Sequence, residues 1–228
     1  MNRLQDLVFI VFIFFFIAAC NKNSHKPQRP LDPWAFRSNL DKQPRMLTLA
    51  LDPECNVAYD LAHCTLYKVW KGGVTLEGAV YTSKKNVQPT TWGRSYFSDS
   101  IRPFQWIAEI NGRKDSFQII NKGYVFRDNQ IYLKFLLIPS SKDTIHIEER
   151  PEFIRDETGN PALERTFKTS GVKDDITISI KSRDTVFKLK ANNTCRFVSN
   201  FNSLPMQYHP DQQEEYDHRG RYYMEKSD

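Results

Sequence analysis

Most of the chain alternates apolar and polar residues with the period of two that is typical of β-strands. Thirteen short segments with this pattern follow one another at intervals of about ten residues, which is the spacing of all-β sandwiches. The segments are residues 46–51, 56–59, 65–70, 74–82, 104–110, 116–120, 124–127, 131–138, 144–149, 163–169, 176–180, 185–189 and 195–198. Turn signals such as Gly72-Gly73 and Asn111-Gly112 separate them. The pattern predicts an all-β fold, an antiparallel sandwich or jelly-roll-like domain.

Helical periodicity is weak, with one exception at the start of the β domain. In residues 33–40, the spacing of Trp34, Phe36 and Leu40 favours a short helix that packs on the sheet. We expect the domain to cover residues 30–200, a length that buries roughly 70% of the surface of the unfolded chain. In residues 201–228, six acidic residues stand against three basic ones with few aliphatics, which predicts an extended or disordered tail.

The first twenty residues follow a different pattern. Residues 7–19 are an unbroken apolar run, with Arg3 before it and Cys20 after it. The run is shorter than the roughly 20 residues of a membrane-spanning helix, so it predicts a signal peptide over residues 1–19. The tetrad IAAC at residues 17–20 resembles a bacterial lipobox, which implies cleavage before Cys20 and acylation of its thiol. An ordinary secretory signal or an uncleaved anchor is the alternative.

The segment that follows Cys20 is polar and basic. Residues 20–29 contain no large apolar side chain to bury and read as a tether. Residues 21–50 carry a net charge of +4 out of +5 for the whole chain. Cations beside a lipid anchor favour anionic headgroups, whereas the remaining charge is too dilute to indicate nucleic acid binding. In the lipobox sorting rule, Asn21 implies the outer membrane, so we expect a lipid-anchored envelope protein that faces the periplasm.

Because the compartment outside the cytoplasm is oxidising, the expected export favours disulfide formation by the cysteines. Three cysteines are present besides Cys20, namely Cys55, Cys64 and Cys195. The odd number predicts one disulfide and one spare thiol and does not identify the pair. No zinc-type spacing and no Cys-x-x-Cys-His haem attachment sequence is present, so we expect no metal and no cofactor.

A family resemblance is carried by the runs PWAFRSNLDKQPRMLTLAL, VAYD, CTLYKVWKGGV, GAVYT and QPTTWGRSYF, which lie within residues 33–97. Together with IHIEERPEF and LERTF further along, they resemble the amino-terminal β domain of large exported bacterial proteins that carry a c-type cytochrome module. The haem-bearing region of that family has no counterpart in this sequence, so electron transfer is not carried over. The resemblance implies an extracytoplasmic β module that stands alone or beside a redox or dehydrogenase partner.

Several aromatic and basic side chains are candidates for ligand contacts. Trp92 lies in residues 84–94, which read as a loop, and Tyr96 follows shortly after. Sugar- and peptide-binding sandwiches expose such rings as stacking platforms, although large rings also fill sandwich cores. Arg37 could bind an anionic group, and the alternative is an ion pair with Asp41 that holds the first strand.

Three glutamates are candidates for a pair of catalytic carboxylates. Alternation over residues 74–82 puts Glu77 on the polar face of that segment, while Glu148 and Glu149 end another one. Two facing carboxylates about 5 to 10 Å apart would suit glycoside hydrolysis, but solvated or ion-paired glutamates are the default in so charged a chain. No nucleophile elbow, phosphate-binding loop or zinc-protease helix is present.

Two functional hypotheses follow. The first is a non-catalytic binding or scaffold module that engages a protein partner or a glycan. The second is an accessory or degenerate subunit, carbohydrate-active or part of a redox complex, that uses Glu77 with Glu148 or Glu149. Two facing carboxyl groups in a deep aromatic cleft would favour the second hypothesis, and a filled sandwich with a shallow patch would favour the first.

Overall fold

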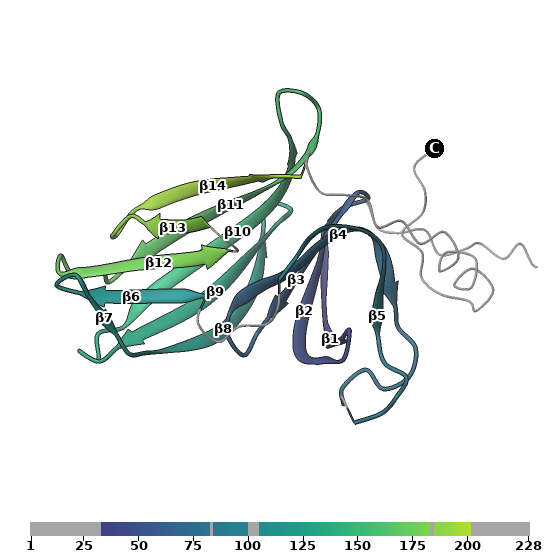
Figure 1. Ribbon diagram of the computed structural model, residues 1–228, viewed down its shortest axis with the longest axis horizontal. Coiled ribbons are helices and arrows are strands. Elements are labelled where there is room, and N and C mark those ends of the chain that lie inside the picture. Colours follow the sequence, from purple (N-terminus) through teal and green to yellow (C-terminus); the bar gives the residue numbers. More distant parts are fainter. Residues whose placement is uncertain (1–32, 83, 100–104, 183–184, 202–228) are drawn as a thin grey trace, which may run out of the picture.

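The computed structural model of the chain describes residues 33–82, 84–99, 105–182 and 185–201. These residues form fourteen β-strands and no helix. The strands make three sheets in which every neighbouring pair is antiparallel (Figure 1). The antiparallel all-β fold predicted from the alternation is therefore confirmed.

The three sheets follow the chain closely, and we name them A, B and C. Sheet A consists, in spatial order, of β1 (Trp34–Leu40), β2 (Gln43–Asp52), β3 (Cys55–Asp60), β4 (Thr65–Thr75) and β5 (Thr90–Ser98). Sheet B consists of β13 (Thr185–Leu189), β12 (Ile176–Ser182), β6 (Trp106–Ile110) and β7 (Arg113–Asp115). Sheet C consists of β14 (Thr194–Asn200), β11 (Pro161–Ser170), β10 (Ile145–Arg155), β9 (Gln130–Pro139) and β8 (Phe117–Arg127).

The main core lies between sheet C on one side and sheets A and B on the other. In Figure 1, sheet B lies against one half of sheet C, and sheet A lies beside them. Trp106 on β6 packs edge-on against Phe135 and Phe167 of sheet C, with ring centroids 6.1 and 6.4 Å apart. Its indole N–H donates a hydrogen bond to the carbonyl oxygen of Cys64 at 2.9 Å. One indole ring of sheet B therefore contacts side chains of sheet C and the turn between β3 and β4 of sheet A.

Sheet C has one buried face and one open face. Along β9, Leu133, Phe135 and Leu137 are buried in the main core, whereas Lys134 between them is exposed. Such strict alternation is expected when an antiparallel sheet covers a core on one side only. The outward positions of sheet C are therefore available to a ligand or partner.

The helix predicted for residues 33–40 is wrong, because this segment is strand β1. It pairs with β2 so that Trp34 lies opposite Ala50 and Phe36 opposite Thr48. Two residues apart on a strand, Trp34 and Phe36 share one face, and their rings stack at 5.2 Å. Pairing with a long neighbouring strand outweighs the helical spacing that the three apolar residues suggest.

The break predicted at Gly72-Gly73 is also wrong, because β4 continues to Thr75 and pairs with β5 throughout. Gly72 lies opposite Gly93, and both have positive φ, 137° and 100°. A Cβ on Gly72 would overlap the carbonyl oxygen of Trp92, and one on Gly93 would overlap that of Lys71. The glycines therefore allow the two strands to approach and bend together, and residues 76–82 form a connection instead of a strand.

Two smaller differences concern strand and domain ends. The predicted segments 116–120 and 124–127 are one strand, β8, with a bulge between Asn121 and Tyr124. At the far end, Phe201 is buried and stacks on Tyr96 at 5.2 Å, so the domain extends one residue past the predicted boundary. The predicted signal peptide, the tether with Cys20, and the tail beyond Phe201 lie outside the described residues.

Candidate functional site

A hollow of about 670 Å³ opens on the outer face of sheet C. It spans β8, β9, β10 and β11, and its polar lining includes Lys122, Arg127, Lys134, His146, Glu148 and Lys168. Volumes of 300 to 1,000 Å³ are usual for ligand sites, so the hollow is large enough for a small ligand or a short stretch of polymer. It is the candidate site for binding.

Strand register brings the charges of the hollow together. On β10, Glu148 lies directly between Lys134 of β9 and Lys168 of β11. Arg127 of β8 adds an ion pair to Glu148, with Nη2 and Oε2 2.5 Å apart, and the hydrogen bond to Glu148 raises the pKa of the Arg127 guanidinium. With Lys122, four cationic side chains and one carboxylate line the hollow, which leaves three positive charges in excess.

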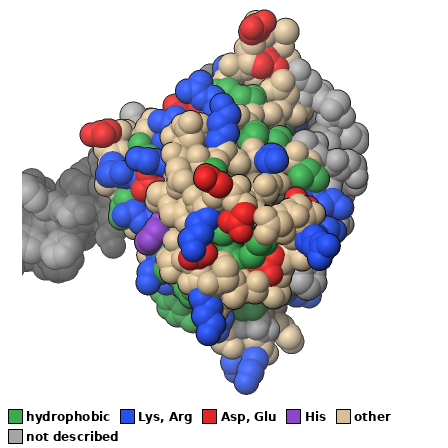
Figure 2. All heavy atoms as spheres, turned by 90° about the vertical axis from the view of Figure 1, so that its left-hand side faces the viewer, with side chains coloured by type: hydrophobic (Ala, Val, Ile, Leu, Met, Phe, Trp, Pro, Cys, Tyr) green, Lys and Arg blue, Asp and Glu red, His purple; other side chains and the backbone are tan. Residues whose placement is uncertain are grey.

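The surface at one end of the molecule carries charges of both signs. Viewed from the end of the molecule where β7 and β12 project, lysines and arginines are interspersed with acidic side chains (Figure 2). Interspersed charges largely neutralise one another at distances beyond the Debye length of about 8 Å. A local excess of one sign inside a concave site, by contrast, focuses the field on a ligand of opposite charge.

The inner face of sheet C carries a second charged cluster, which is fully buried. Glu149 is 0% exposed and accepts hydrogen bonds from Nε of Arg165, at 2.6 Å, and from the hydroxyl of Tyr59. Tyr59 lies on β3, whereas Glu149 and Arg165 lie on β10 and β11. The cluster therefore ties sheet A to sheet C through the middle of the core.

Burial and charge raise the pKa values of two members of this cluster, Tyr59 and Arg165. Burial, followed by the negative charge of Glu149, raises the pKa of Tyr59 well above its ordinary value. Burial by itself would lower the pKa of Arg165, but the charges and hydrogen bonds of Glu149 and Tyr59 outweigh it and raise that pKa. Among the described residues, the other carboxylate oxygen of Glu149, Oε2, has no hydrogen-bond partner.

The three carboxylates considered as a catalytic pair do not meet. Glu148 and Glu149 are neighbours on β10 and therefore point to opposite faces of sheet C. Glu149 is sealed in the core, and Glu148 lines the open hollow. Glu77 lies in the connection between β4 and β5 of sheet A and does not line the hollow.

Trp92 and Tyr96, the predicted ligand contacts, are buried side chains of β5. The loop predicted around Trp92 is wrong, since residues 90–98 form a strand and Trp92 is only 9% exposed. Its ring lies where a Cβ on Gly73 would be, so it fills the bend between β4 and β5. Tyr96 is 2% exposed, and burial, together with the charge of Glu54, raises its pKa to about 12. Neither ring is a surface platform for stacking.

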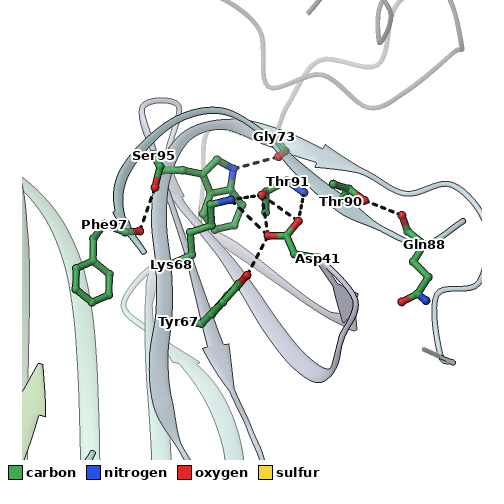
Figure 3. A network of polar contacts seen from close by, with 10 residues as sticks. Asp41, Tyr67, Lys68, Gly73, Gln88, Thr90, Thr91, Ser95 and Phe97 are labelled. Atoms are coloured by element: carbon green, nitrogen blue, oxygen red, sulfur yellow. Dashed lines mark hydrogen bonds and ion pairs between the residues drawn. The ribbon is translucent and has the colours of Figure 1, made fainter. Parts of the chain in front are cut away.

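Arg37 and Asp41, predicted as an ion pair or an anion site, have separate environments. Arg37 is exposed on β1. Asp41, in the turn after β1, instead accepts hydrogen bonds from the backbone N–H and the hydroxyl of Thr91, each at 2.8 Å (Figure 3). Tyr67 and Lys68 of β4 donate to the same carboxylate, each at 3.4 Å. We call these four residues, Asp41, Tyr67, Lys68 and Thr91, the Asp41 clasp.

Cys55, Cys64 and Cys195 are all buried, and no disulfide joins any two of them in the structure, so the expected pair is not formed there. Burial and the charges of Asp60 and Glu149 raise the pKa of the Cys64 thiol to about 12. A buried thiol with a raised pKa is unreactive at neutral pH.

Two absences can be stated for the described residues. No group of three or more His, Cys, Asp or Glu side chains within residues 33–82, 84–99, 105–182 and 185–201 could hold a metal ion. The same described ranges contain no helix that is long and apolar enough to cross a membrane.

No protein-family model, curated protein or solved structure matches this chain. The functional interpretation therefore depends on the geometry of the molecule and on the two resemblances noted in the sequence.

The hollow and the buried Glu149 cluster both contain residues that are not among the candidates predicted from sequence. For the buried cluster, the sequence pattern does contain a signal. Glu149 follows Ile145 and Ile147 at intervals of two, and Arg165 stands between Leu163 and Phe167 in the same way. A charge at an inward position on each of two strands indicates a buried ion pair. The cations of the hollow lie on different strands, and only the strand register shows that Lys134 and Lys168 flank Glu148.

Proposed function

We propose that the chain is a lipid-anchored, non-catalytic binding module of the bacterial cell envelope that takes an acidic glycan in the hollow on sheet C. The observation that carries the proposal is the excess of cationic side chains in that hollow, around the single carboxylate Glu148. The lipobox-like IAAC at residues 17–20 supports the anchor, and the resemblance to exported β domains supports the location outside the cytoplasm.

The choice of ligand follows from the lining. Stacking of a neutral sugar needs an exposed aromatic face, but the predicted rings Trp92 and Tyr96 are buried. On the outer face of β9, Tyr132 is half-buried, and the guanidinium of Arg127 lies 3.8 Å from its ring centroid. Charge is therefore the recognition chemistry that the hollow offers. A recessed site that crosses four strands suits an extended polymer with carboxylate or sulfate groups better than a flat protein surface.

The binding role does not need a reacting group. Acid–base work on a glycosidic bond requires two carboxyl groups on the same side of a cleft, whereas β10 separates Glu148 from Glu149. Glu148 has a sufficient role as counter-ion, since it forms an ion pair with Arg127 and lies between Lys134 and Lys168 in the strand register.

Calorimetric titration tests the proposal with a matched pair of ligands. Oligogalacturonate is the acidic probe, and the same oligosaccharide with its carboxylates methyl-esterified is the neutral control. We expect heat of binding with the acidic probe only, and its loss in the double variant Lys134→Gln and Lys168→Gln. Equal binding of both sugars would contradict a charge-based site. No binding of either, together with capture of an envelope protein through the same two lysines, would favour the protein partner.

A further inference from the structure

Exposed apolar side chains concentrate in the connection between β4 and β5. Six large hydrophobic residues of the described chain are exposed, and three of them, Leu76, Tyr81 and Val87, belong to this one connection. Tyr81 is the most exposed, at 87%. Apolar side chains scattered singly over a surface need no explanation, but several exposed in one short connection indicate an interaction surface. We call Leu76, Tyr81 and Val87 the apolar tip.

The connection that carries the apolar tip is held in shape by hydrogen bonds. Its two arms are joined by Ala79 N–H to the carbonyl oxygen of Val87, at 2.9 Å. It is bonded to the end of β1 by Asn39 N–H to the carbonyl of Val80, at 2.7 Å, and by Asp41 N–H to that of Pro89, at 3.0 Å. The apolar side chains are thus displayed at the surface by a bonded framework.

The Asp41 clasp holds the end of this connection, where β5 begins. Asp41 binds Thr91, the second residue of β5, while Lys68 donates to both Asp41 and the Thr91 hydroxyl (Figure 3). Together with the bend at Gly72 and Gly93, the clasp holds the β4–β5 hairpin against the end of β1. The position of the apolar tip is therefore coupled to β1, the first strand of the domain.

The surroundings of the apolar tip are basic. Lys84 and Lys85 lie in the connection itself and are exposed, and Lys42 is exposed in the turn next to Asp41. The acidic residue Glu77 is half-buried. Tyrosine and aliphatic side chains next to lysines are typical of segments that lie in the headgroup region of a membrane, because the rings enter the interface and the cations meet anionic lipids.

The geometry points to a lipid surface as the occupant: the apolar tip rests in the headgroup layer of the membrane to which the chain is anchored. This inference rests on the anchor of the proposed function. Chain length agrees with it, since even fully extended residues between Cys20 and Pro33 span at most about 45 Å. The domain thus stays near the bilayer, and β1 begins where that span ends.

Contact through the apolar tip would orient the whole domain. The tip lies in the connection between β4 and β5 of sheet A, whereas the hollow lies on the outer face of sheet C. None of the tip residues lines the hollow, so contact of the tip with lipid does not cover the cations of the hollow.

The test uses the full chain, anchored in vesicles that contain anionic lipid. Tyr81→Cys carries a polarity-sensitive fluorophore, and Val186→Cys, which replaces a 54% exposed valine on β13, is the matched control. Cys55, Cys64 and Cys195 are buried and should not be labelled in the folded protein. The unsubstituted chain checks this, and labelling of Cys20 there would reveal a thiol without acyl chains.

We expect the Tyr81 probe to shift its emission to the blue and to be quenched by lipid-borne quenchers, while the Val186 probe stays in water. The double variant Lys84→Gln and Lys85→Gln should reduce the shift on anionic vesicles. Vesicle flotation with a Tyr81 probe that remains in water would overturn this inference alone. Failure of the chain to float would overturn the anchor, and with it this inference. A blue shift at high protein concentration without vesicles would overturn it in favour of contact between two copies.

Discussion

Glu148 and Glu149 are identical residues at neighbouring positions of β10, and they have opposite environments. Glu149 faces the core, where Arg165 and Tyr59 bind it without access to water. Glu148 faces the open side of sheet C, where it meets Arg127, Lys134 and Lys168 in a solvated hollow. The inner face uses charge to hold two sheets together. The outer face carries an excess of positive charge, on which the proposed binding role rests.

The energetic difference between the two faces follows from desolvation. A buried charge that loses its partner cannot be solvated, so the loss costs several kcal/mol. An exposed ion pair gains little beyond what water already provides. Substitutions on the inner face should therefore change stability, whereas substitutions on the outer face should change binding.

The largest effect is expected for Arg165→Met, which leaves Glu149 buried without its cation. We expect a loss of about 3 to 5 kcal/mol in the free energy of unfolding, measured by urea denaturation. Arg127→Met is the matched control on the outer face and should leave the urea midpoint nearly unchanged. In addition, Glu149→Leu should restore much of the stability lost in Arg165→Met. Equal effects of the two arginine substitutions would contradict the difference between the faces.

The next largest effect is expected for Tyr59→Phe, which removes one hydroxyl from the buried cluster. Because that hydroxyl donates to a charged acceptor, its loss should cost about 1.5 to 3 kcal/mol. The control is Tyr132→Phe on the open side, whose hydroxyl donates to Gln130 at 3.2 Å. Its urea midpoint should stay close to that of the parent chain. A Tyr59→Phe protein as stable as the parent would show that the bond across the sheets contributes nothing.

The third largest effect is expected from alkaline pH, which should lower the free energy of unfolding. Burial is the largest cause that raises the pKa values of Cys64, Tyr67 and Tyr96 to about 12, from ordinary values of 9.0 for the thiol and 10.0 for the phenols. The unfolded chain therefore releases these protons first. Stability is fully present below about pH 9 and falls as the pH rises towards 12.

Urea midpoints measured between pH 7 and 11.5 would follow this loss. In Cys64→Ala, the share of the decline that these three groups cause should begin nearer pH 10, because the phenols of Tyr67 and Tyr96 are the two that remain. A midpoint that stays constant from pH 9 to 11 would contradict the burial of these groups.

The strand pattern of the sequence predicts most of this fold, because alternation reflects burial on one side of a sheet. The strand pattern gives a wrong prediction where a local sequence signal is compatible with two different structures. Gly72-Gly73 resembles a turn, but here the glycines permit a close approach between paired strands. Trp34 and Phe36 fit one face of a short helix and also one face of a strand, and pairing with β2 selects the strand.

The candidate site was harder to predict than the fold. The inward charges of Glu149 and Arg165 are visible as breaks in an apolar pattern, so the buried pair could have been found. The hollow depends on which residues of four strands lie side by side, and that register is a tertiary property. The loop prediction for Trp92 is wrong because Pro89 and Gly93 are typical of loops, whereas here they flank and bend the strand β5.

The smallest effect on stability is expected for Glu148→Gln, since the carboxylate is accessible to water and its cationic neighbours are solvated. The same change removes the counter-ion and should tighten binding of oligogalacturonate, measured by calorimetry. Glu149→Gln is the control with the same chemistry on the inner face and should lower the urea midpoint strongly. Weaker binding by Glu148→Gln would assign the carboxylate a direct role in holding the ligand.

The most direct measurement of the central claim is the salt dependence of oligogalacturonate binding by the parent chain and by the variant Lys134→Gln with Lys168→Gln. Binding to an excess of positive charge weakens as salt screens it, over a Debye length that shortens from about 10 Å at 0.1 M to 3 Å at 1 M. We expect the affinity of the parent chain to fall steeply with salt, and the variant to bind weakly at every salt concentration with an unchanged urea midpoint. Salt-independent binding, or equal affinity of the two proteins, would contradict the assignment of the open face of sheet C as the binding site.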